Sequence, residues 1–445
     1  MLIRPSPCIR RLDSTIDLLA LHQSQPERYP YLLESVVHGT PQSRYDILFA
    51  FPGAGMEAGD SGFLDQLEQD WRRHHVPVLE TELPFAGGWF VYLGYELAAE
   101  IEPTLNLPAE QTPLPSAFAT RIPAALIRDH HHACTYLVCE PGREALLAQM
   151  EADLGDADAL IDMPPQVLGV EEDDPQRYLD AVNRIRDYIR EGDVFQVNLS
   201  RAWRMQLRQT TAIDVYQSLR RHNPAPFAAL VNYGGTAIIS SSPERLVEVH
   251  DARASTRPIA GTRPRSGDQA ADRAFSDTLM AHPKERAEHV MLIDLERNDL
   301  GRVCQPGSMR VDELMVLESY AHVHHIVSNV SGRLRRGVTP MEVIRAVFPG
   351  GTITGCPKVR CMEIIQALEH TARGPYTGSV GYISHCGRMD FNILIRTMLL
   401  DGDRLSFRTG AGIVADSVAE HELQETRAKA RGLLRALGLD DAASA

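Results

Sequence analysis

The feature that most constrains the fold is an irregular alternation of strand-like and helix-like segments along the chain. Residues 45–51 (YDILFAF) and 89–93 (WFVYL) are short apolar runs of the kind that form strands. A helix is expected after Asp174, with Pro175 in its first turn and Gly192 at its end. Residues 194–201 (VFQVNLSR) then alternate as a strand does. Because no strict β-α-β order is present, the sequence predicts an α+β or mixed α/β fold.

A stretch rich in proline and acidic residues, 163–175 (MPPQVLGVEEDDP), has the composition of a linker. It divides the chain into an N-terminal region, residues 1–162, and a second region, residues 174–438. Further helices are predicted from Pro283, Thr339 and Ser417. The last two residues are each followed three positions later by glutamate, in the pattern of a capping box.

Composition argues against several classes of function. The 445 residues carry 59 acidic and 45 basic side chains, a net charge of −14, whereas a nucleic-acid-binding surface needs a basic stripe. No run approaches the ~20 apolar residues that span a bilayer, and the first residues lack the apolar stretch of a signal peptide. The seven cysteines form no CxxC pair, which is typical of reduced thiols. These features predict a cytoplasmic protein that binds neither nucleic acid nor membrane.

Two of the predicted helices each carry a pair of glutamates three residues apart. Glu285 and Glu288 form one pair, and Glu422 and Glu425 form the other. This spacing places both carboxylates of a pair on one helix face. Converging carboxylates suit Mg²⁺, which accepts one or two of them beside water and substrate oxygens. The alternative is that each pair is a solvated helix face, with Lys429 in an ordinary surface ion pair.

A glycine-rich segment, residues 349–358 (PGGTITGCPK), runs into a predicted helix and could bind an anion at the helix end. It is not a nucleotide-binding P-loop, because Cys356 and Pro357 stand where that motif requires glycine and lysine. A plain turn between two helices is an equally weighted alternative.

Further candidates are scattered along the second region. Gly410 and Gly412 precede the last acidic helix, where they would let a ligand approach the backbone. Arg396 and Tyr376 are residue types that bind carboxylates, although either is more often structural. In residues 323–328 (VHHIVS) the two consecutive histidines face opposite sides of a strand, so one of them is expected to face a site.

Taken in order, these segments resemble the chorismate-utilising enzymes, a family that includes the anthranilate, aminodeoxychorismate, isochorismate and salicylate synthases. The resemblance is dense from residue 174 to 437, and it also covers PFAGGWFVYLGYE (84–96). It is carried by GDVFQVNLSR (192–201), SPERL (242–246), PIAGTRPR (258–265), KERAEHVMLIDLERNDLGRV (284–303), PGGTITGCPKVR (349–360), GPYTGSVGY (374–382) and GAGIVADS (410–417). It implies a large mixed α/β chorismate-binding fold of two layered β-sheets flanked by helices.

The resemblance also implies roles for the acidic residues. Glu288 and Glu425 match the acids that hold Mg²⁺, the expected cofactor, and Glu285 and Glu422 match the acids that support them. The metal would anchor the ring carboxylate of chorismate. Glu244 matches the general acid that protonates the departing C4 hydroxyl, which is otherwise a poor leaving group.

Other positions match residues that line the substrate pocket of the family. His325 matches an active-site histidine. The implied substrate-binding residues are Tyr376, Arg396, Gly410, Gly412, Lys429, Thr352, Gly261 and Thr262.

Residue 196 indicates whether the enzyme adds water or ammonia to chorismate. Family members that add water carry a lysine where this chain has Gln196, and an amide cannot act as that base. The resemblance therefore implies ammonia. Neither TGCPK (354–358) nor SHCGR (384–388) matches the glycine-flanked nucleophile of a glutamine amidotransferase. A separate glutamine amidotransferase subunit is therefore expected as the partner that supplies ammonia.

The sequence divides between two ammonia-using members of the family. Residues 223–230 (NPAPFAAL), 350–355 (GGTITG) and 386–390 (CGRMD) resemble the aminodeoxychorismate type, which aminates C4. Ala260 departs from that type, in which a lysine at this position adds covalently at C2. Residues 32–35 (LLES) resemble a segment that holds regulatory tryptophan in anthranilate synthases.

Three segments outweigh one residue and one short motif, so the sequence favours aminodeoxychorismate synthase component I. That enzyme makes 4-amino-4-deoxychorismate for para-aminobenzoate and folate synthesis. The alternative is anthranilate synthase component I, which makes anthranilate and pyruvate for tryptophan synthesis. With Ala260, substitution at C4 would proceed without a lysine adduct, through water or a second ammonia at C2.

Overall fold

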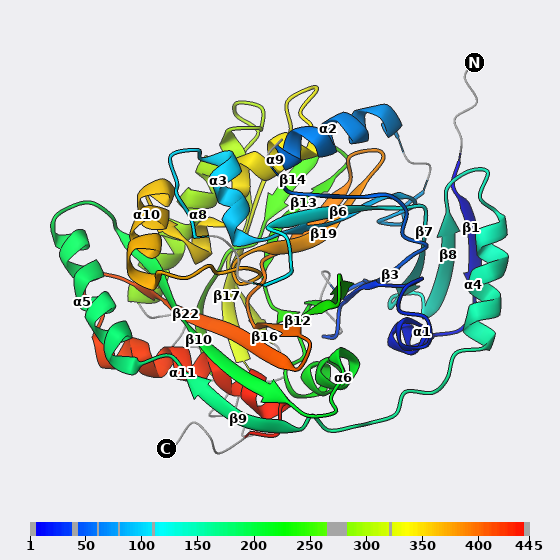
Figure 1. The fold of residues 1–445 in the computed structure, drawn as a ribbon. Coiled ribbons are helices and arrows are strands. Elements are labelled where there is room, and N and C mark those ends of the chain that lie inside the picture. The colour runs from blue at the N-terminus through cyan, green and yellow to red at the C-terminus, as the bar shows by residue number, and fades with distance from the viewer. Residues whose placement is uncertain are drawn as a thin grey trace.

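Two large antiparallel sheets form the centre of the molecule, as the computed structural model shows (Figure 1). The structure describes residues 6–37, 43–59, 62–78, 81–108, 112–264, 283–319 and 323–439. Its first sheet consists, in spatial order, of β1 (Cys8–Leu12), β8 (Cys134–Cys139), β7 (Ala124–Asp129), β3 (Tyr45–Ala50), β2 (Tyr31–Glu34), β11 (Phe227–Tyr233), β12 (Thr236–Ser242), β21 (Thr397–Asp401), β22 (Arg404–Ile413), β10 (Gln196–Leu207) and β18 (Gly355–Cys356), with β9 (Val167–Glu172) paired to β10.

The second sheet packs against the first. It consists of β15 (Ile259–Pro264), β17 (Val323–Arg333), β14 (Arg253–Thr256), β13 (Arg245–His250), β20 (Met389–Asn392), β19 (Ser379–Ser384), β5 (Gly88–Leu93), β6 (Ala117–Ile122) and β4 (Gly55–Glu57), with β16 (Arg310–Ser319) paired to β17. Both sheets contain strands from the two regions of the sequence. The layered α+β fold expected from the sequence is confirmed.

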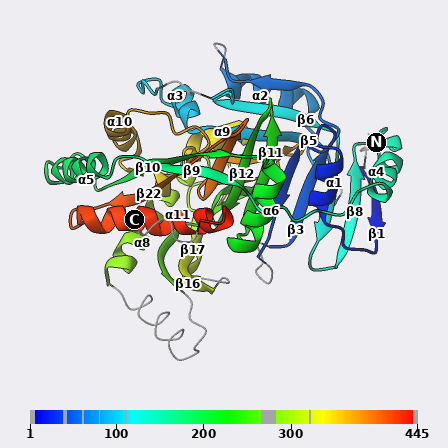
Figure 2. The same ribbon diagram turned by 60° about the horizontal axis from the view of Figure 1, so that its bottom comes forward.

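Helices cover the outer faces of the two sheets. They are α1 (Leu18–Ser24), α2 (Phe63–His74), α3 (Ala98–Ile101), α4 (Ala145–Gly155), α5 (Pro175–Arg190), α6 (Ala212–His222), α8 (Pro283–Gly301), α9 (Pro340–Val347), α10 (Lys358–Glu369) and α11 (Ala419–Ala436), with short 3₁₀ turns η1 (Tyr95–Leu97) and η2 (Gly351–Ile353). Figure 2 shows α11 running across the β10–β22 part of the first sheet, with α5 and α6 at its two ends. None of the described helices is long and apolar enough to cross a membrane.

An aromatic core fills the space between the sheets. Phe49 of the first sheet lies edge-on to Phe90 of the second, with ring centroids 5.4 Å apart, and both rings are fully buried. Burial of such rings is a large source of stability in a fold of this kind. Because these rings are apolar, the polar side chains that are also buried in the fold require a separate explanation.

Several local predictions are confirmed and others are wrong. Asp174 accepts a hydrogen bond from Gln176 N at the start of α5, and Thr339 forms the expected capping box of α9. Ser417 does not cap α11: its Oγ accepts a hydrogen bond from the backbone N of Val414, and Val418 takes the N-cap position. The predicted linker, residues 163–175, contains strand β9, because the edge of β10 offers it backbone partners.

Candidate active site

Two glycines of β22 open a space beside β10. In the pairing of these strands, Asn198 lies opposite Gly412, two residues after Gln196. A Cβ atom on Gly412 would lie 2.2 Å from Gln196 Nε2, and one on Gly410 would lie 2.7 Å from the Tyr376 hydroxyl. Because no larger residue fits, both glycines are required for these polar side chains to occupy the space.

The predicted metal-binding acids approach this space from two helices. Gln196 Nε2 donates a hydrogen bond of 3.3 Å to Glu288 Oε1, which brings α8 to the β10 strand. On α11, Glu425 forms a 2.8 Å ion pair with Lys429, whose Nζ also donates to the Gly410 carbonyl at 2.9 Å. The two carboxylates thus belong to chains of contact that end at the same pair of glycines.

The donor set suits a hard cation. Carboxylates from α8 and α11 are the ligands Mg²⁺ prefers, with its other positions left to water and substrate. Glu422, one turn before Glu425, joins it in raising the pKa of the buried Tyr178 hydroxyl, an effect that burial dominates. The Glu285 side chain lies outside the described residues, within which no three His, Cys, Asp or Glu side chains form a metal site. Magnesium therefore stays a prediction.

A buried carboxyl group, that of Glu244, interacts with Lys429 and Arg396. Glu244 is 6% exposed, and its Oε1 accepts a 2.8 Å hydrogen bond from Thr352 Oγ1 in the η2 turn. Burial raises the pKa of Glu244 to about 7, although Thr352, Lys429 and Arg396 act in the other direction. About half of these carboxyl groups therefore hold a proton at neutral pH, where free glutamate would be ionised, and can release it as a general acid must.

His325 of β17 is uncharged in this environment. Burial and the neighbouring Arg396 lower its pKa to about 3, while a backbone hydrogen bond with Gly261 opposes that shift. The imidazole is 2% exposed. It therefore takes part in the site as a neutral hydrogen-bonding group rather than as a cation.

The strand that carries the subfamily-dependent position runs beside His325. In the β15–β17 pairing, Ala260 lies opposite Ile326 and Thr262 opposite His325, with an irregularity between them at Gly261, whose φ is +63°. The side chains of Ala260 and Thr262 lie outside the part of the chain that the structure describes. The backbone nevertheless places position 260 next to the candidate histidine, because the adjacent Gly261 bonds to His325.

One arginine that the sequence reasoning missed connects the walls of the site. Arg373 donates to the backbone carbonyls of Asn198 at 2.8 Å and Ile353 at 3.3 Å, and its guanidinium lies 5.5 Å from the centre of the Tyr376 ring. It is neutralised by the fully buried Glu369, at 2.7 Å. Its position directly before the GPYTG segment and four residues after Glu369 was the available signal.

Thr377, next to Tyr376, has a φ of +63°. A positive φ is rare for a β-branched residue and indicates a conformation that its surroundings impose. Arg373 Nη1 donates to Thr377 Oγ1 at 3.2 Å, and so contributes to holding the strained segment. The orientation of Tyr376 therefore depends on a buried ion pair outside the site itself.

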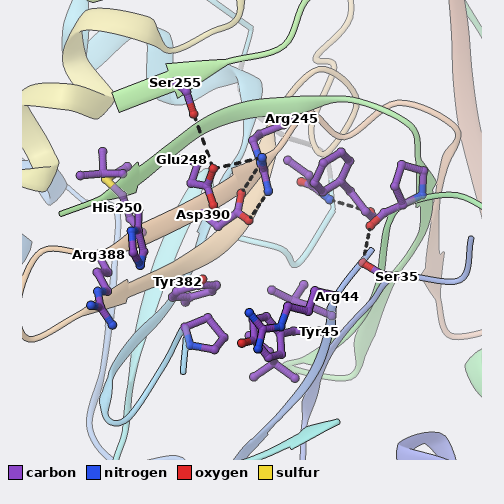
Figure 3. Close-up of a pocket in the computed structure, with 18 of the residues that line it drawn as sticks. Ser35, Arg44, Tyr45, Arg245, Glu248, His250, Ser255, Tyr382, Arg388 and Asp390 are labelled. Carbon is purple, nitrogen blue, oxygen red and sulfur yellow. Dashed lines mark hydrogen bonds and ion pairs between the residues drawn. The ribbon is translucent and has the colours of Figure 1, made fainter. Parts of the chain in front are cut away.

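A cavity of about 520 Å³ lies between the sheets (Figure 3). It is called the second cavity because Gln196, Glu244 and Glu288 of the candidate active site do not line it. Its lining includes residues 33–35 and 226–228, from the two segments that point to different subfamilies. Ser35 Oγ donates to the Pro226 carbonyl at 3.0 Å and so joins these segments. Arg245 donates two 2.9 Å hydrogen bonds to the Asp390 carboxylate, and its guanidinium carbon lies 5.0 Å from the centre of the Phe227 ring.

Comparison with known proteins identifies the class. Residues 50–435 match the model of the chorismate binding enzyme family, and the chain belongs to this family. It is 41% identical to aminodeoxychorismate synthase component 1 of Bacillus subtilis (82% of this chain, 81% of that protein) and 37% identical to anthranilate synthase component 1 of Pseudomonas putida (97% and 94%). The structure of anthranilate synthase component I from Streptococcus pneumoniae superimposes with a TM-score of 0.79 at 32% identity, over 89% of this chain and 93% of that one.

Proposed function

We propose that this chain is an Mg²⁺-dependent synthase that replaces the C4 hydroxyl of chorismate with an amino group, as aminodeoxychorismate synthase component I does. Amination is supported by the position of Gln196, which contacts Glu288 and Gly412 in the candidate active site. An amide has no basic lone pair with which to deprotonate water at neutral pH, whereas ammonia needs no such base. Ammonia is therefore the nucleophile that the site supports best.

The other side chains of the site have separate roles in substrate binding and proton transfer. Arg396, Lys429 and the Tyr376 hydroxyl offer donors to the two carboxylates of chorismate, with Arg396 able to bind in bidentate fashion. Glu244 gives its proton to the departing hydroxyl, which leaves as water. His325 contributes a neutral hydrogen bond in the same enclosed space. Mg²⁺, held by Glu288 and Glu425, would supply a fixed positive charge for the ring carboxylate.

Amination at C4 is supported by three segments of the sequence, at residues 223–230, 350–355 and 386–390. The resemblance to the Bacillus subtilis protein agrees with it. Amination at C2, followed by loss of pyruvate to give anthranilate, is the second candidate. It is favoured by Ala260, by residues 32–35, of which 33–35 line the second cavity, and by several relatives named anthranilate synthase component 1.

We propose as well that a separate glutamine amidotransferase subunit supplies the ammonia. The relatives are named as component 1, and the sequence offers no glutaminase motif of its own. The test is to follow the loss of chorismate absorbance by the purified chain, with Mg²⁺ and either ammonium or glutamine. Turnover is expected with ammonium alone, and should rise toward alkaline pH as free ammonia forms. Turnover with glutamine would contradict the partner proposal, and no turnover with either would contradict the amination itself.

A further inference from the structure

Two amide side chains on one face of β10 have acceptor oxygens that no described residue hydrogen-bonds. They are Gln196 Oε1 and Asn198 Oδ1, and both oxygens are buried without a bond to any described residue. Gln196 as a whole is only 5% exposed. Buried acceptors are nearly always satisfied in folded proteins, so two neighbouring exceptions in a candidate active site point to a ligand.

The orientation of Gln196 is fixed by its own contacts. Its Nε2 donates to the Glu288 carboxylate, so the amide cannot be turned without placing an oxygen against that negative charge. The remaining atom of the amide, Oε1, is therefore an acceptor by necessity. The glycine at 412 leaves the room this side chain occupies.

The backbone of Asn198 is held by residues that do not belong to the paired strand β22. Its N–H donates to the Thr354 carbonyl at 2.9 Å, and its carbonyl accepts from Arg373 at 2.8 Å. A Cβ atom on Gly410 would lie 2.9 Å from Asn198 Oδ1 and 2.7 Å from the Tyr376 hydroxyl. The amide oxygen of Asn198 therefore lies in the same glycine-lined space as Gln196 and Tyr376.

The hydrogen-bonding capacity of these two oxygens restricts which molecules can bind there. Two acceptors need a ligand that donates N–H or O–H bonds. The carboxylates of chorismate only accept, and each would repel an amide oxygen. Ammonia has three N–H donors and one lone pair. It can donate to both oxygens and still direct the lone pair at a carbon atom.

On this basis we propose that Gln196 Oε1 and Asn198 Oδ1 together form the binding site for the ammonia nucleophile. The inference rests on the proposed amination and adds Asn198 as a residue that contacts the attacking group. In the reaction, the C4 hydroxyl takes the Glu244 proton and leaves as water, and the ammonia lone pair forms the C–N bond at C4. The water or second ammonia that adds at C2 in between is released again, so it does not enter the sum. The new ammonium group then loses one proton, which restores Glu244, so that the sum is chorismate plus ammonia giving the amine plus water.

The arrangement of the two oxygens also explains how the site selects ammonia over water as the nucleophile. Two neutral acceptors placed two residues apart on one strand can hold two N–H bonds of ammonia. Water bound there could donate to both oxygens, but no group on the strand removes its proton. Positioning of this kind acts on the nucleophile alone and leaves the affinity for chorismate unchanged.

The test is Asn198→Leu, which keeps the branched shape of the side chain and removes its hydrogen-bonding atoms. We expect the KM for ammonium to rise about tenfold, as for one lost hydrogen bond, with the KM for chorismate and the thermal midpoint nearly unchanged. Tyr376→Phe should show the opposite pattern, a higher KM for chorismate. Gln206→Leu, on the exposed end of the same strand, should change neither value.

The inference is overturned if Asn198→Leu raises the KM for chorismate and leaves that for ammonium unchanged, because the oxygen then contacts the substrate instead. If the leucine variant does not fold, Asn198→Ser decides: a hydroxyl acceptor in place of the amide should give a smaller rise in the ammonium KM, and an unchanged value contradicts the site. Failure of the wild-type chain to consume chorismate would contradict the proposed function, which separates the two results.

Discussion

Two buried polar regions of this molecule differ in how their charges and acceptors are satisfied. In the cavity between the sheets, Arg245 is bound by Asp390 on one side and by Glu248 at 3.2 Å on the other. In the candidate active site, Gln196 and Asn198 keep acceptor oxygens with no described partner. The charge of Arg245 is thus neutralised within the protein, whereas these two oxygens are left for a substrate to satisfy.

The largest effect is expected at the acids predicted to bind the metal. Glu288→Gln or Glu425→Gln should lower Mg²⁺-dependent turnover of chorismate about a thousandfold, because a bound cation contributes several kcal/mol of charge stabilisation. The thermal midpoint should change little, since the Glu425 side chain is half exposed. The measurement is chorismate consumption across a range of Mg²⁺ concentrations.

Glu420→Gln is the matched control on the same helix. Glu420 is an exposed acid in the first turn of α11 and should tolerate the change. Near-normal activity of Glu288→Gln at low Mg²⁺ would show that the acids on α8 do not hold the metal.

The next effect concerns the proton on Glu244. Its raised pKa means that the carboxyl is protonated below about pH 7 and loses its proton above it. With free ammonia held constant, kcat/KM should therefore fall about tenfold per pH unit above pH 7. Glu244→Gln should remove most of the activity and abolish this dependence. A rate that stays flat to pH 9 in the wild type would exclude Glu244 as the acid.

The same group should affect stability with a defined sign. Its pKa is higher in the folded than in the unfolded chain, so its stabilising contribution is complete below about pH 4.5 and is lost as the pH rises through about 7. Glutamine avoids this loss because it stays neutral. The thermal midpoint of Glu244→Gln should therefore rise relative to wild type between pH 5 and pH 8, and an unchanged difference would argue against the raised pKa.

A smaller effect on the rate is expected for one of the two arginines that bind the Glu369 carboxylate, and none for the other. Arg373 and Arg408 are both buried and both bind Glu369, but only Arg373 also contacts Asn198 and Ile353. Arg373→Lys should lower kcat/KM about tenfold, because lysine cannot span these carbonyls. Arg408→Lys should destabilise the fold to a similar extent with less than a twofold change in rate. Equal losses of activity would show that the buried network has only a general structural role.

The smallest effect is expected in the second cavity. Ser35→Ala removes the hydrogen bond to Pro226 and should cost about 1 kcal/mol of stability. Turnover at saturating substrate should stay within twofold of wild type, since no residue of the active site is touched. Thermal unfolding and chorismate consumption measure the two quantities. A large loss of turnover would mean that the cavity and the active site are not independent.

Much of the fold could be predicted because it rests on local rules. The start of α5 follows from Asp174 and Pro175, and that of α9 from Thr339, since capping depends on residues close in sequence. Ser417 shows the limit of such rules, because its hydroxyl found a nearer partner in the preceding turn. The pairing that joins the N-terminal strands to the catalytic ones could not be predicted, since register depends on contacts far apart in the chain.

The site shows the same division. Individual acids such as Glu288 and Glu244 were identified through the resemblance to the family. The contact of Gln196 with Glu288 and Gly412, and the bridge that Arg373 makes between the walls, exist only in three dimensions. Burial also sets the opposite pKa shifts of Glu244 and His325, and sequence spacing carries no information about burial.

The identity of the product tests the central claim most directly. The chain is incubated with chorismate, Mg²⁺ and ammonium, and the product is identified by mass and fluorescence. We expect a nonfluorescent amine that retains the enolpyruvyl group, because amination at C4 leaves that ether intact. Ala260→Lys is the companion variant, in which a C2 adduct should be detectable by mass. Steady accumulation of fluorescent anthranilate together with pyruvate would contradict amination at C4 and show that Ala260 marks the C2 reaction.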